Sequence, residues 1–462
     1  MLILKKIPLF HLSPALPVSR MAQRLFPVIL LLSLMTSCQE PPPPKPEPYP
    51  NTVLHLEALQ VNSIEAALKI TLTNLDSLTG DTLPIVLKRD GTAVQAFNFI
   101  PPDTSLWDEG LEPDRTYTYT AYRQSVHNSA RVDSSNSISL TTMDTTSHDF
   151  SFETFTFGGE VGTGSSSLYD VAIINENNIW AVGEIYVPDP DSSWNGTGWK
   201  DYSVAQWDGE EWNLKVLQAG SENVHPRGIW AFSENDIWFA SGSIYHWDGE
   251  NTSLEWLRDI SSSETVEKIW GSSPENIYFV GNEGTIVHYD GSDFTRLESG
   301  TEQTIQDIWG IRESNTGEEF ILCAVSHPLG YGERKILRIL PDKTIDTLPW
   351  PSSRWANSIW FNQKMEIFSC GTGVLRYGYD EQWHELAGET ITPAFTESIR
   401  GQHNNDIFIV GDYGVVVHYN GLHFKRYTEV PNALYQACSY RDDMMVAVGQ
   451  RSGRAVILRM SR

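Results

Sequence analysis

Short segments in which apolar and polar residues alternate recur along the chain from Val53 to its end, separated by clusters of Gly, Asp, Asn, Ser and Pro. Alternation with a period of two is typical of strands that bury one face, and turn residues at intervals of about ten positions are typical of antiparallel sheets. The sequence therefore predicts an all-β fold. Its 462 residues also provide enough material for more than one domain.

The first group of strands, in residues 51–145, predicts a small sandwich, with Asp90-Gly91 as one hairpin turn. The segment Thr104–Tyr122, TSLWDEGLEPDRTYTYTAY, resembles the signature of fibronectin type III domains, in which a corner tyrosine follows a Gly-Leu and a proline. The resemblance implies a sandwich, and since no Arg-Gly-Asp adhesion tripeptide is present we expect a structural spacer. The residues that carry it are Asp108, Gly110, Leu111, Pro113 and Tyr117.

The remaining residues, 146–462, form an internal repeat. EKIWGSSPENIYFVG from Glu267 and ESIRGQHNNDIFIVG from Glu397 align without gaps, and each full unit holds four short strands. A four-stranded unit of about 40 residues is a propeller blade, so the sequence predicts a seven-bladed β-propeller. The equivalent positions in the first strand are Ala172, Trp230, Trp270, Trp309, Trp360, Arg400 and Cys438.

These units resemble the bacterial repeats of the form IWGSSPEDIYAVGDGGTILHYDG, which are distantly similar to the propellers of photosystem assembly factors and sialidases. The resemblance implies the fold and says little about function. Some similar proteins carry a glucosyltransferase label, but this chain has no nucleotide-sugar motif. It also lacks the Asp-box of sialidase repeats, Ser-x-Asp-x-Gly-x-Thr-Trp.

Turn residues punctuate each repeat. An Asp-Gly or Asn-Gly pair predicts a two-residue type I′ hairpin before the fourth strand, and the aromatic residue before it is expected to pack between blades. A glycine at the end of the second strand is expected to permit a sharp turn. The pairs are Asp208-Gly209, Asp248-Gly249, Asp290-Gly291 and Asn420-Gly421, the aromatics are Trp207, Trp247, Tyr289 and Tyr419, and the glycines are Gly183, Gly281, Gly371, Gly411 and Gly449.

The last repeat has only three strands before the chain ends. An isolated strand, Ser151–Gly158, precedes the first blade and has no blade of its own. A sheet with an unpaired edge is vulnerable, and a ring must close. We therefore expect Ser151–Gly158 to pair with Ala455–Met460 and complete the seventh blade.

Residues 1–37 predict a lipoprotein signal peptide, with Met21 as the better start. The apolar run Leu25–Met35 is too short to cross a bilayer and follows Arg24. Residues 35–38, Met-Thr-Ser-Cys, resemble the lipobox of bacterial lipoproteins, which implies that Cys38 is acylated and becomes the mature N-terminus. A plain secretory signal is the alternative. Gln39 favours the outer membrane, on either its periplasmic or its exposed side.

The prolines in residues 38–50 favour polyproline II and predict a stiff stalk of roughly 30 Å between the lipid and the folded domains. The formal net charge is −26, and four of the 33 Lys and Arg residues lie within the first 37 positions. So acidic a surface repels phosphate backbones, which argues against nucleic-acid binding. Cys323, Cys370 and Cys438 lie in apolar runs and are expected to be buried thiols.

The sequence shows no catalytic motif: a Gly-x-Ser-x-Gly elbow, a His-Glu-x-x-His pair, a phosphate-binding glycine loop and Cys/His metal spacings are all missing. His246, His288 and His418 are equivalent positions in different blades and are not expected to converge on one metal. No cofactor or metal is predicted. A pair of glycosidase-type carboxylates among 59 acidic residues is left open, so enzymatic activity is uncertain and the motifs lean against it.

Two insertions interrupt the repeat between the second and third strands, Tyr186–Tyr202 in blade one and Ser326–Lys335 in blade four. In a propeller such loops and the links between blades lie on one face around the channel mouth, so this is the expected binding face. The aromatics there suit a sugar or a protein contact, or they cap the insert's own small core. The candidate ligand-binding residues are Trp194, Trp199, Tyr202, His327, Tyr331, Arg354 and Trp355.

Together these observations predict a lipid-anchored envelope protein whose propeller is a non-catalytic binding or scaffolding module for a protein or polysaccharide. Two alternatives stay open. The first is a carbohydrate-active enzyme, a glycosidase or a glucosyltransferase-like protein, with its site on the same face. The second is a structural subunit of an envelope assembly.

Overall fold

The structure, a computed structural model, describes residues 53–73, 82–124, 132–159, 164–189, 198–258, 264–327, 332–351, 353–363, 366–378, 380–388 and 390–462. The chain divides into two compact units, Met1–Pro46 and Glu47–Arg462, and the described residues belong to the second. The predicted signal peptide, Cys38 and the stalk lie outside the described residues. Within them, no helix is long and apolar enough to cross a membrane.

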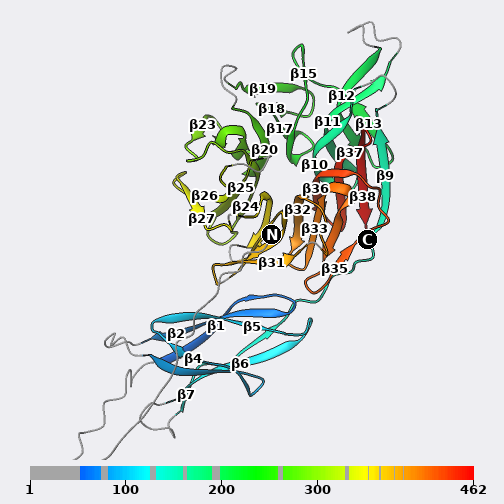
Figure 1. Ribbon diagram of the computed structural model, residues 1–462. Helices are drawn as coiled ribbons and strands as arrows, with labels where there is room; N and C mark the ends of the chain where they lie inside the picture. The colour runs from blue at the N-terminus through cyan, green and yellow to red at the C-terminus, as the bar shows by residue number, and fades with distance from the viewer. Residues whose placement is uncertain are drawn as a thin grey trace, which may run out of the picture. The chain divides into compact units, whose positions relative to one another are not determined.

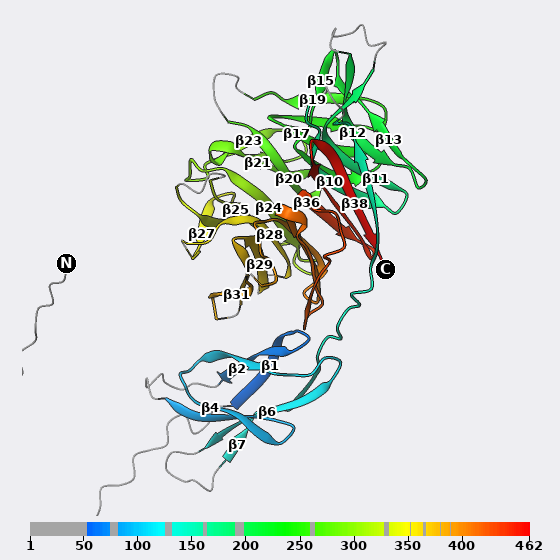
Figure 2. The same cartoon turned by 45° about the vertical axis from the view of Figure 1, so that its right-hand side comes forward.

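Residues 53–141 form two antiparallel sheets that share one core (Figure 2). The Tyr117 hydroxyl accepts a hydrogen bond of 2.8 Å from the backbone N–H of Glu112, as expected of a corner tyrosine. Asp90 and Gly91 both have positive φ and form the predicted hairpin turn. One sheet comprises β1 (Val53–Val61), β2 (Glu65–Thr73) and β5 (Asp103–Glu109); the other comprises β4 (Thr92–Phe99), β3 (Leu83–Arg89), β6 (Thr116–Gln124), β7 (Val132–Ser134) and β8 (Ile138–Thr141).

Seven further sheets occupy residues 151–461 (Figure 1). The first three are β10 (Ser167–Asn175), β11 (Asn178–Pro188), β12 (Trp199–Trp207) and β13 (Trp212–Lys215); then β16 (Gly228–Ser233), β17 (Asp236–Ser241), β18 (Ser243–Trp247) and β19 (Thr252–Trp256), extended by β14 (Leu217–Ala219) and β15 (Glu222–Val224); then β20 (Val266–Ser273), β21 (Asn276–Gly281), β22 (Ile286–Tyr289) and β23 (Phe294–Leu297), with the short helix η1 (Asn282–Gly284).

The remaining four sheets follow the same order from first to last strand. They are β24 (Ile305–Arg312), β25 (Glu319–Val325), β26 (Lys335–Ile339) and β27 (Ile345–Leu348); β28 (Ala356–Gln363), β29 (Glu366–Gly371), β30 (Gly373–Tyr377) and β31 (Trp383–Ala387); β32 (Thr396–His403), β33 (Asp406–Gly411), β34 (Val416–Tyr419) and β35 (Phe424–Arg426), with η2 (Asp412–Gly414); and β36 (Leu434–Arg441), β37 (Met444–Arg451), β38 (Arg454–Ser461) and β9 (Ser151–Phe157).

The first strands of these sheets form a closed circuit. Each contacts the first strand of the next sheet, and β36 of the last sheet contacts β10 of the first. Figure 2 shows β10, β20, β24, β28 and β36 toward the middle of the ring. Apolar side chains of neighbouring sheets interlock between them, so each sheet buries its faces against the next.

The predicted closure of the ring is confirmed. β9 pairs antiparallel with β38, from Ala455 opposite Phe157 to Ser461 opposite Ser151. The Phe155 ring packs against Trp207 and Trp212 of the first sheet, with centroids 6.1 and 6.0 Å away. One strand from before the first sheet thus joins the last sheet and covers its edge.

The register corrects one predicted position. In the sixth sheet Gly411 lies opposite Thr396 and Arg400 lies opposite Phe408; in the seventh, Gly449 lies opposite Tyr435. Counting from these glycines makes Ser439, and not Cys438, the equivalent of Arg400. Cys438 is instead a buried thiol, as are Cys323 and Cys370, and these three described cysteines are free.

The hairpin prediction was wrong in its turn type. Trp207 pairs with Trp212, so the loop has four residues, and only Gly209 of the Asp208-Gly209 pair has positive φ. The Asp208 carboxylate accepts backbone N–H groups of the two residues that end the loop, and Asp248, Asp290 and Asn420 do the same. The preceding aromatics do pack between sheets, as in Trp247 against Trp180 at 5.8 Å and Tyr289 against Trp238 at 5.2 Å.

The glycines at the ends of the second strands have a different role from the predicted one. Gly281 and Gly411 have extended backbone, with φ of −179°, so no sharp turn requires them. A Cβ at any of the five positions would overlap a backbone carbonyl oxygen at the start of the first strand. Close approach of two strands therefore selects glycine here. The oxygens belong to Ser167, Thr265, Trp355, Phe395 and Leu434 for Gly183, Gly281, Gly371, Gly411 and Gly449.

A buried polar junction joins the sandwich to the fifth and sixth sheets of the ring. The Glu366 carboxylate, which is 2 % exposed, accepts hydrogen bonds from Gln60 Nε2 at 2.5 Å and Asn62 Nδ2 at 2.9 Å. Arg376 of the ring contacts both Glu65 of the sandwich and Glu366. The sandwich is therefore bound to the ring through ionised and amide groups that are withdrawn from water.

Candidate functional site

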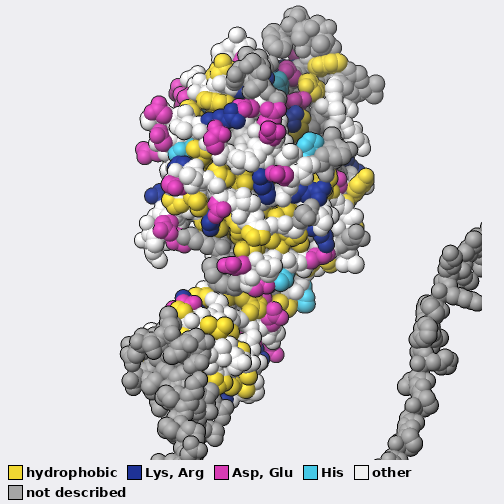
Figure 3. Space-filling view, turned by 60° about the vertical axis from the view of Figure 1, so that its left-hand side comes forward, with side chains coloured by type: hydrophobic (Ala, Val, Ile, Leu, Met, Phe, Trp, Pro, Cys, Tyr) yellow, Lys and Arg dark blue, Asp and Glu magenta, His cyan; other side chains and the backbone are white. Residues whose placement is uncertain are grey.

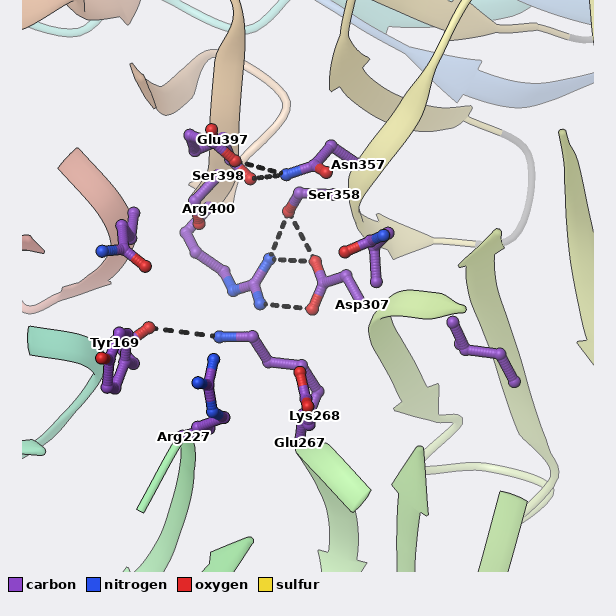
Figure 4. Close-up of a pocket in the computed structure, with 13 residues that line it drawn as sticks. Tyr169, Arg227, Glu267, Lys268, Asp307, Asn357, Ser358, Glu397, Ser398 and Arg400 are labelled. Atoms are coloured by element: carbon purple, nitrogen blue, oxygen red, sulfur yellow. Dashed lines mark hydrogen bonds and ion pairs between the residues drawn. The ribbon is translucent and has the colours of Figure 1, made fainter. Parts of the chain in front are cut away.

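The first strands of all seven sheets surround a pocket of about 190 Å³ at the centre of the ring, which we name the channel-mouth pocket (Figure 4). Each sheet contributes a side chain from the same place in its repeat, two residues before the isoleucine of the Ile-Trp pair where that pair is present. The seven residues differ in size and charge. In sheet order they are Tyr169, Arg227, Glu267, Gln306, Asn357, Glu397 and Gln436.

β-Bulges explain why polar residues at these positions face the channel. In six of the seven first strands the pairing with the second strand skips the pocket residue, for example Glu397 between Thr396 and Ser398. A bulge re-aims the side chain of the unpaired residue without ending the strand. The isoleucine two residues later, such as Ile399, is buried between sheets. The bulge therefore releases one polar residue from an otherwise apolar strand.

A buried ion pair forms one wall of the pocket and links sheets that are not neighbours. Arg400 of the sixth sheet donates from Nη1 and Nη2 to the two carboxylate oxygens of Asp307 of the fourth, at 2.8 and 2.9 Å. Ser358 of the fifth sheet donates to Asp307 at 2.5 Å. Burial alone would raise the pKa of Asp307, but the charge and hydrogen bonds of Arg400 lower it below its ordinary value. The carboxylate is therefore ionised.

Two aromatic rings are linked to this ion pair. The Arg400 guanidinium sits over the Trp309 ring, 4.9 Å from its centroid, and the Trp309 ring lies 6.0 Å from that of Trp230. Trp309 Nε1 donates to the Phe361 carbonyl at 2.9 Å. Side chains from the second, fourth and sixth sheets are therefore in contact with one another.

Glu397 is the carboxylate in the pocket with the most unusual environment. Its carboxylate accepts a hydrogen bond of 2.8 Å from Asn357 Nδ2. Burial, followed by the charge of Asp412, raises the pKa of Glu397 to about 7, although the Asn357 hydrogen bond and the charge of Lys268 oppose the shift. The pocket therefore contains a carboxyl group that changes its charge near neutral pH.

Two cations lie on the opposite side of the pocket. Lys268 forms an ion pair of 3.1 Å with Asp170 and also reaches the Tyr169 carbonyl oxygen. Arg227 is exposed and lies over the Tyr169 ring at 4.8 Å from its centroid, and within the described part of the chain no ion pair involves it. The channel-mouth pocket thus combines fixed internal ion pairs with charged groups that have no charged partner.

The two insertions begin at the same end of the ring as this pocket. Because the first two strands of a sheet are antiparallel, the start of the first lies beside the end of the second, where the insertions start. Gln306 of the pocket donates to the carbonyl of Ser326, the first residue of one insertion, at 2.8 Å. Tyr186, which starts the other, donates its backbone N–H to Ser166 just before β10.

The candidate residues that the structure describes lie outside the lining of the channel-mouth pocket. Trp194 and Tyr331 fall outside the described residues. Trp199 is half-buried and pairs with Pro188, and Tyr202 packs on the core between the first and last sheets. His327 is half-buried next to Ser326.

The last two candidates, Arg354 and Trp355, lie in the link just before β28, the first strand of the fifth sheet. Arg354 forms an ion pair of 2.6 Å with Glu385, and the Trp355 ring packs edge-on against Phe395, 5.1 Å away. These contacts hold both side chains in place beside the face on which the pocket opens.

The pocket is lined by amide, hydroxyl and charged side chains. No group of three or more His, Cys, Asp and Glu residues that could hold a metal occurs among the described residues. His246, His288 and His418 each contact a residue of the second strand of their own sheet, at 2.9, 2.7 and 2.7 Å, and do not converge. Amide, hydroxyl and charged groups converge on the pocket instead, and they can orient a small polar group.

The repeat contained a signal that could have identified the pocket. In Arg-Gly-Ile-Trp, Glu-Lys-Ile-Trp, Gln-Asp-Ile-Trp, Asn-Ser-Ile-Trp and Glu-Ser-Ile-Arg, the first residue is polar in every copy and differs between most of them. A position that stays polar without keeping one residue type is typical of a surface that meets something other than a neighbouring repeat. Only the bulge shows that this position faces the channel.

Comparison with known proteins identifies the fold. No protein-family model matches the sequence, and no curated protein sequence matches it. The solved structure of YCF48 bound to D1 peptide has 14 % sequence identity and a TM-score of 0.50, covering 67 % of this chain and 97 % of that one.

Two further solved structures match this chain over nearly their whole length. The WD40 β-propeller domain of Doa1 has 13 % sequence identity and a TM-score of 0.48, and the match covers 68 % of this chain and 98 % of that one. YCF48 from Cyanidioschyzon merolae has 14 % sequence identity and a TM-score of 0.47, and the match covers 67 % of this chain and 98 % of that one. At such low identity the likeness concerns the fold alone. The ring of sheets in residues 151–461 is a β-propeller.

Proposed function

We propose that this protein is a lipid-anchored, non-catalytic binding module of the bacterial envelope. In this proposal Cys38 carries the lipid, the proline-rich stalk and a fibronectin type III-like domain hold the head away from the outer membrane, and a seven-bladed propeller binds a protein partner at the channel-mouth pocket. The lipobox and stalk in the sequence support the anchor. The single observation that carries the binding role is the ring of seven polar side chains, of five residue types, around one pocket.

Some members of that ring form hydrogen bonds within the protein, such as Gln306 with Ser326 and Asn357 with Glu397, but packing does not dictate their residue types. Core positions of the repeat stay apolar because packing requires it: two residues after the pocket position the residue is isoleucine in five copies, Val171 in the first and Cys438 in the last. The pocket positions vary, and polar groups such as the guanidinium of Arg227 lack a charged partner among the described residues. A surface with varied, partly unsatisfied polar groups over a rigid base is suited to recognising one ligand.

A protein is the favoured ligand. The solved structure of YCF48 bound to D1 peptide has a similar fold, and propellers commonly use the face with long loops for binding. The pocket is small, so it suits one side chain or one end of a partner rather than a long segment. The insertions at the same end would supply the remaining contact area.

The experiment is site-specific photo-crosslinking in cells of the source bacterium. A photo-reactive amino acid replaces Gln306 or Gln436 in the pocket, and in a control chain it replaces Glu275, which is exposed in the turn between β20 and β21 at the opposite end of the ring. We expect one protein to be captured from both pocket positions and not from Glu275. Capture from all three positions alike, or from Glu275 alone, would contradict the proposed site. Capture of a saccharide in place of a protein at the two pocket positions would favour a polysaccharide ligand.

A further inference from the structure

The charged groups of the channel-mouth pocket divide into those that are already paired and those that are not. Arg400 pairs with Asp307 and Lys268 pairs with Asp170. Among the described residues, no ion pair involves Arg227, Glu267 or Glu397. The groups left for a ligand are therefore one guanidinium and two carboxylates, an excess of one negative charge.

Position distinguishes these groups further. Arg227 is exposed at the rim, where water solvates its charge, whereas Glu397 is half-buried and has one amide donor, Asn357. A carboxylate gains most from a cation where water is excluded, because attraction is stronger in a low dielectric. Glu397 is thus the group in the pocket whose charge a ligand would stabilise most.

We propose that the channel-mouth pocket receives a basic side chain of the protein partner, an ammonium or guanidinium group, which pairs with Glu397. This inference rests on the proposed function and adds the chemistry of the ligand. The overall charge agrees with this proposal, because the chain has 59 acidic and 33 basic residues. Its negative charge would attract a basic partner from a distance. Figure 3 shows acidic side chains distributed over one face of the head, with Lys and Arg between them.

The same pairing would link binding to protons. Groups near Glu397 are Asp412 of η2, Lys268 of β20 and Asn357 of β28, and burial and Asp412 together raise the pKa of its carboxyl to about 7. A cation must displace the proton that the empty carboxyl holds below this pH. Affinity for a basic ligand should therefore fall by about tenfold per pH unit below the pKa and become constant above it.

The test uses the full chain in detergent and a fluorescent hexalysine peptide with acetylated and amidated ends, with hexaglutamate as the opposite probe. Anisotropy at about pH 8 and about pH 6 measures affinity, because lysine itself keeps its charge over this range. We expect Glu397→Gln to weaken hexalysine binding about tenfold or more at the higher pH and to remove its pH dependence. Arg227→Gln, which removes the exposed cation at the rim, should strengthen binding.

Glu275→Gln is the matched control, because it removes the same charge from the opposite end of the ring and should leave affinity unchanged. Melting temperatures show whether each variant folds, and Arg227→Gln provides a second test at an exposed site. Equal hexalysine affinity of wild type and Glu397→Gln, preference for hexaglutamate, or no binding of either peptide would overturn the inference. Crosslinking of a partner from Gln306 and Gln436 would then still support the proposed function, so the two failures are distinguishable.

Discussion

Arg376 of the propeller binds both carboxylate oxygens of Glu65 in the sandwich, 311 residues away in sequence. The Arg376 side chain is 17 % exposed and that of Glu65 is 6 % exposed, and the guanidinium also lies 5.6 Å from the centre of the Trp107 ring. A bidentate pair at such low exposure fixes orientation as well as distance. The junction is therefore expected to be stiff, and the sandwich is more than a passive spacer.

The first prediction concerns this pair. Arg376→Ala leaves Glu65 and Glu366 buried without their cation and should lower the free energy of unfolding by about 3 to 5 kcal/mol, as for other broken buried pairs. Chemical denaturation of the full chain measures the loss. The control is Arg338→Ala, which breaks the exposed pair with Asp346 and should change stability by less than about 1 kcal/mol. Similar losses in both variants would show that the junction adds no stability of its own.

The second prediction is the pH dependence of the junction. Burial raises the pKa of Glu366 to about 7, with the charge of Glu65 acting in the same direction and that of Arg376 against it. The folded state therefore holds a proton that the unfolded chain, with an ordinary glutamate pKa, has already lost. Stability from this group is present below about pH 4.5 and falls as the pH rises toward 7. Denaturation of Glu366→Gln at several pH values should show a smaller decline than wild type, and parallel curves would contradict the assignment.

The third prediction concerns closure of the ring. Phe155→Ala removes a ring that packs on Trp207 and Trp212 and should lower the free energy of unfolding by about 2 kcal/mol. Glu153→Ala on the same strand is the control, because Glu153 is exposed and forms only a long ion pair of 3.6 Å with Arg459. An unchanged melting temperature for Phe155→Ala would mean that β9 contributes little to closure.

The fourth prediction concerns the ion pair in the pocket wall. Arg400→Leu strands a buried Asp307 carboxylate and should be destabilising by about 3 kcal/mol or more, whereas adding Asp307→Leu should restore part of the loss. A double-mutant cycle measures the coupling between the two positions. Additive losses would indicate that the two side chains do not act as a pair.

The fifth prediction concerns the anchor. Cys38→Ala should prevent incorporation of a fatty-acid probe and move the protein from the membrane fraction to the soluble fraction, since each buried CH₂ of a lipid chain contributes about 0.8 kcal/mol. Ser37→Ala keeps the thiol and serves as the control. An unlabelled, freely soluble wild-type protein would contradict the prediction.

The all-β propeller was predictable because the repeat makes its local signals agree. The pairing of the isolated strand Ser151–Gly158 with the last sheet was also predictable, because only the last repeat lacked a fourth strand. Bulges limited the rest: one extra residue in six of the seven first strands shifts the register, so Cys438 was placed one position early and the pocket residues were not recognised. A bulge has no residue type of its own and is detected only through pairing.

The sequence pattern did not predict contacts between segments that are distant in the chain. Glu366 is a strand-initiating acid like many others in the chain, and nothing local indicates that Gln60 and Asn62 enclose its carboxylate. The exchange of Trp for Arg at position 400 was visible in the repeat, but its partner Asp307 lies 93 residues earlier. The glycines ending the second strands were correctly located; close strand approach explains all five, and a positive φ also favours glycine at Gly371 alone among them.

The linker between the sandwich and β9 determines which contacts would bear a force applied to the chain. Asp144 and Thr146 in this linker exchange hydrogen bonds of 2.7 and 2.6 Å with Asn405 of the ring before the chain enters β9. Tension applied through the N-terminal end of the chain would load the Glu65–Arg376 contact and these bonds before it reached β9. Under such a force β9, the strand that closes the propeller, would bear load last. The sandwich would deform before the ring does.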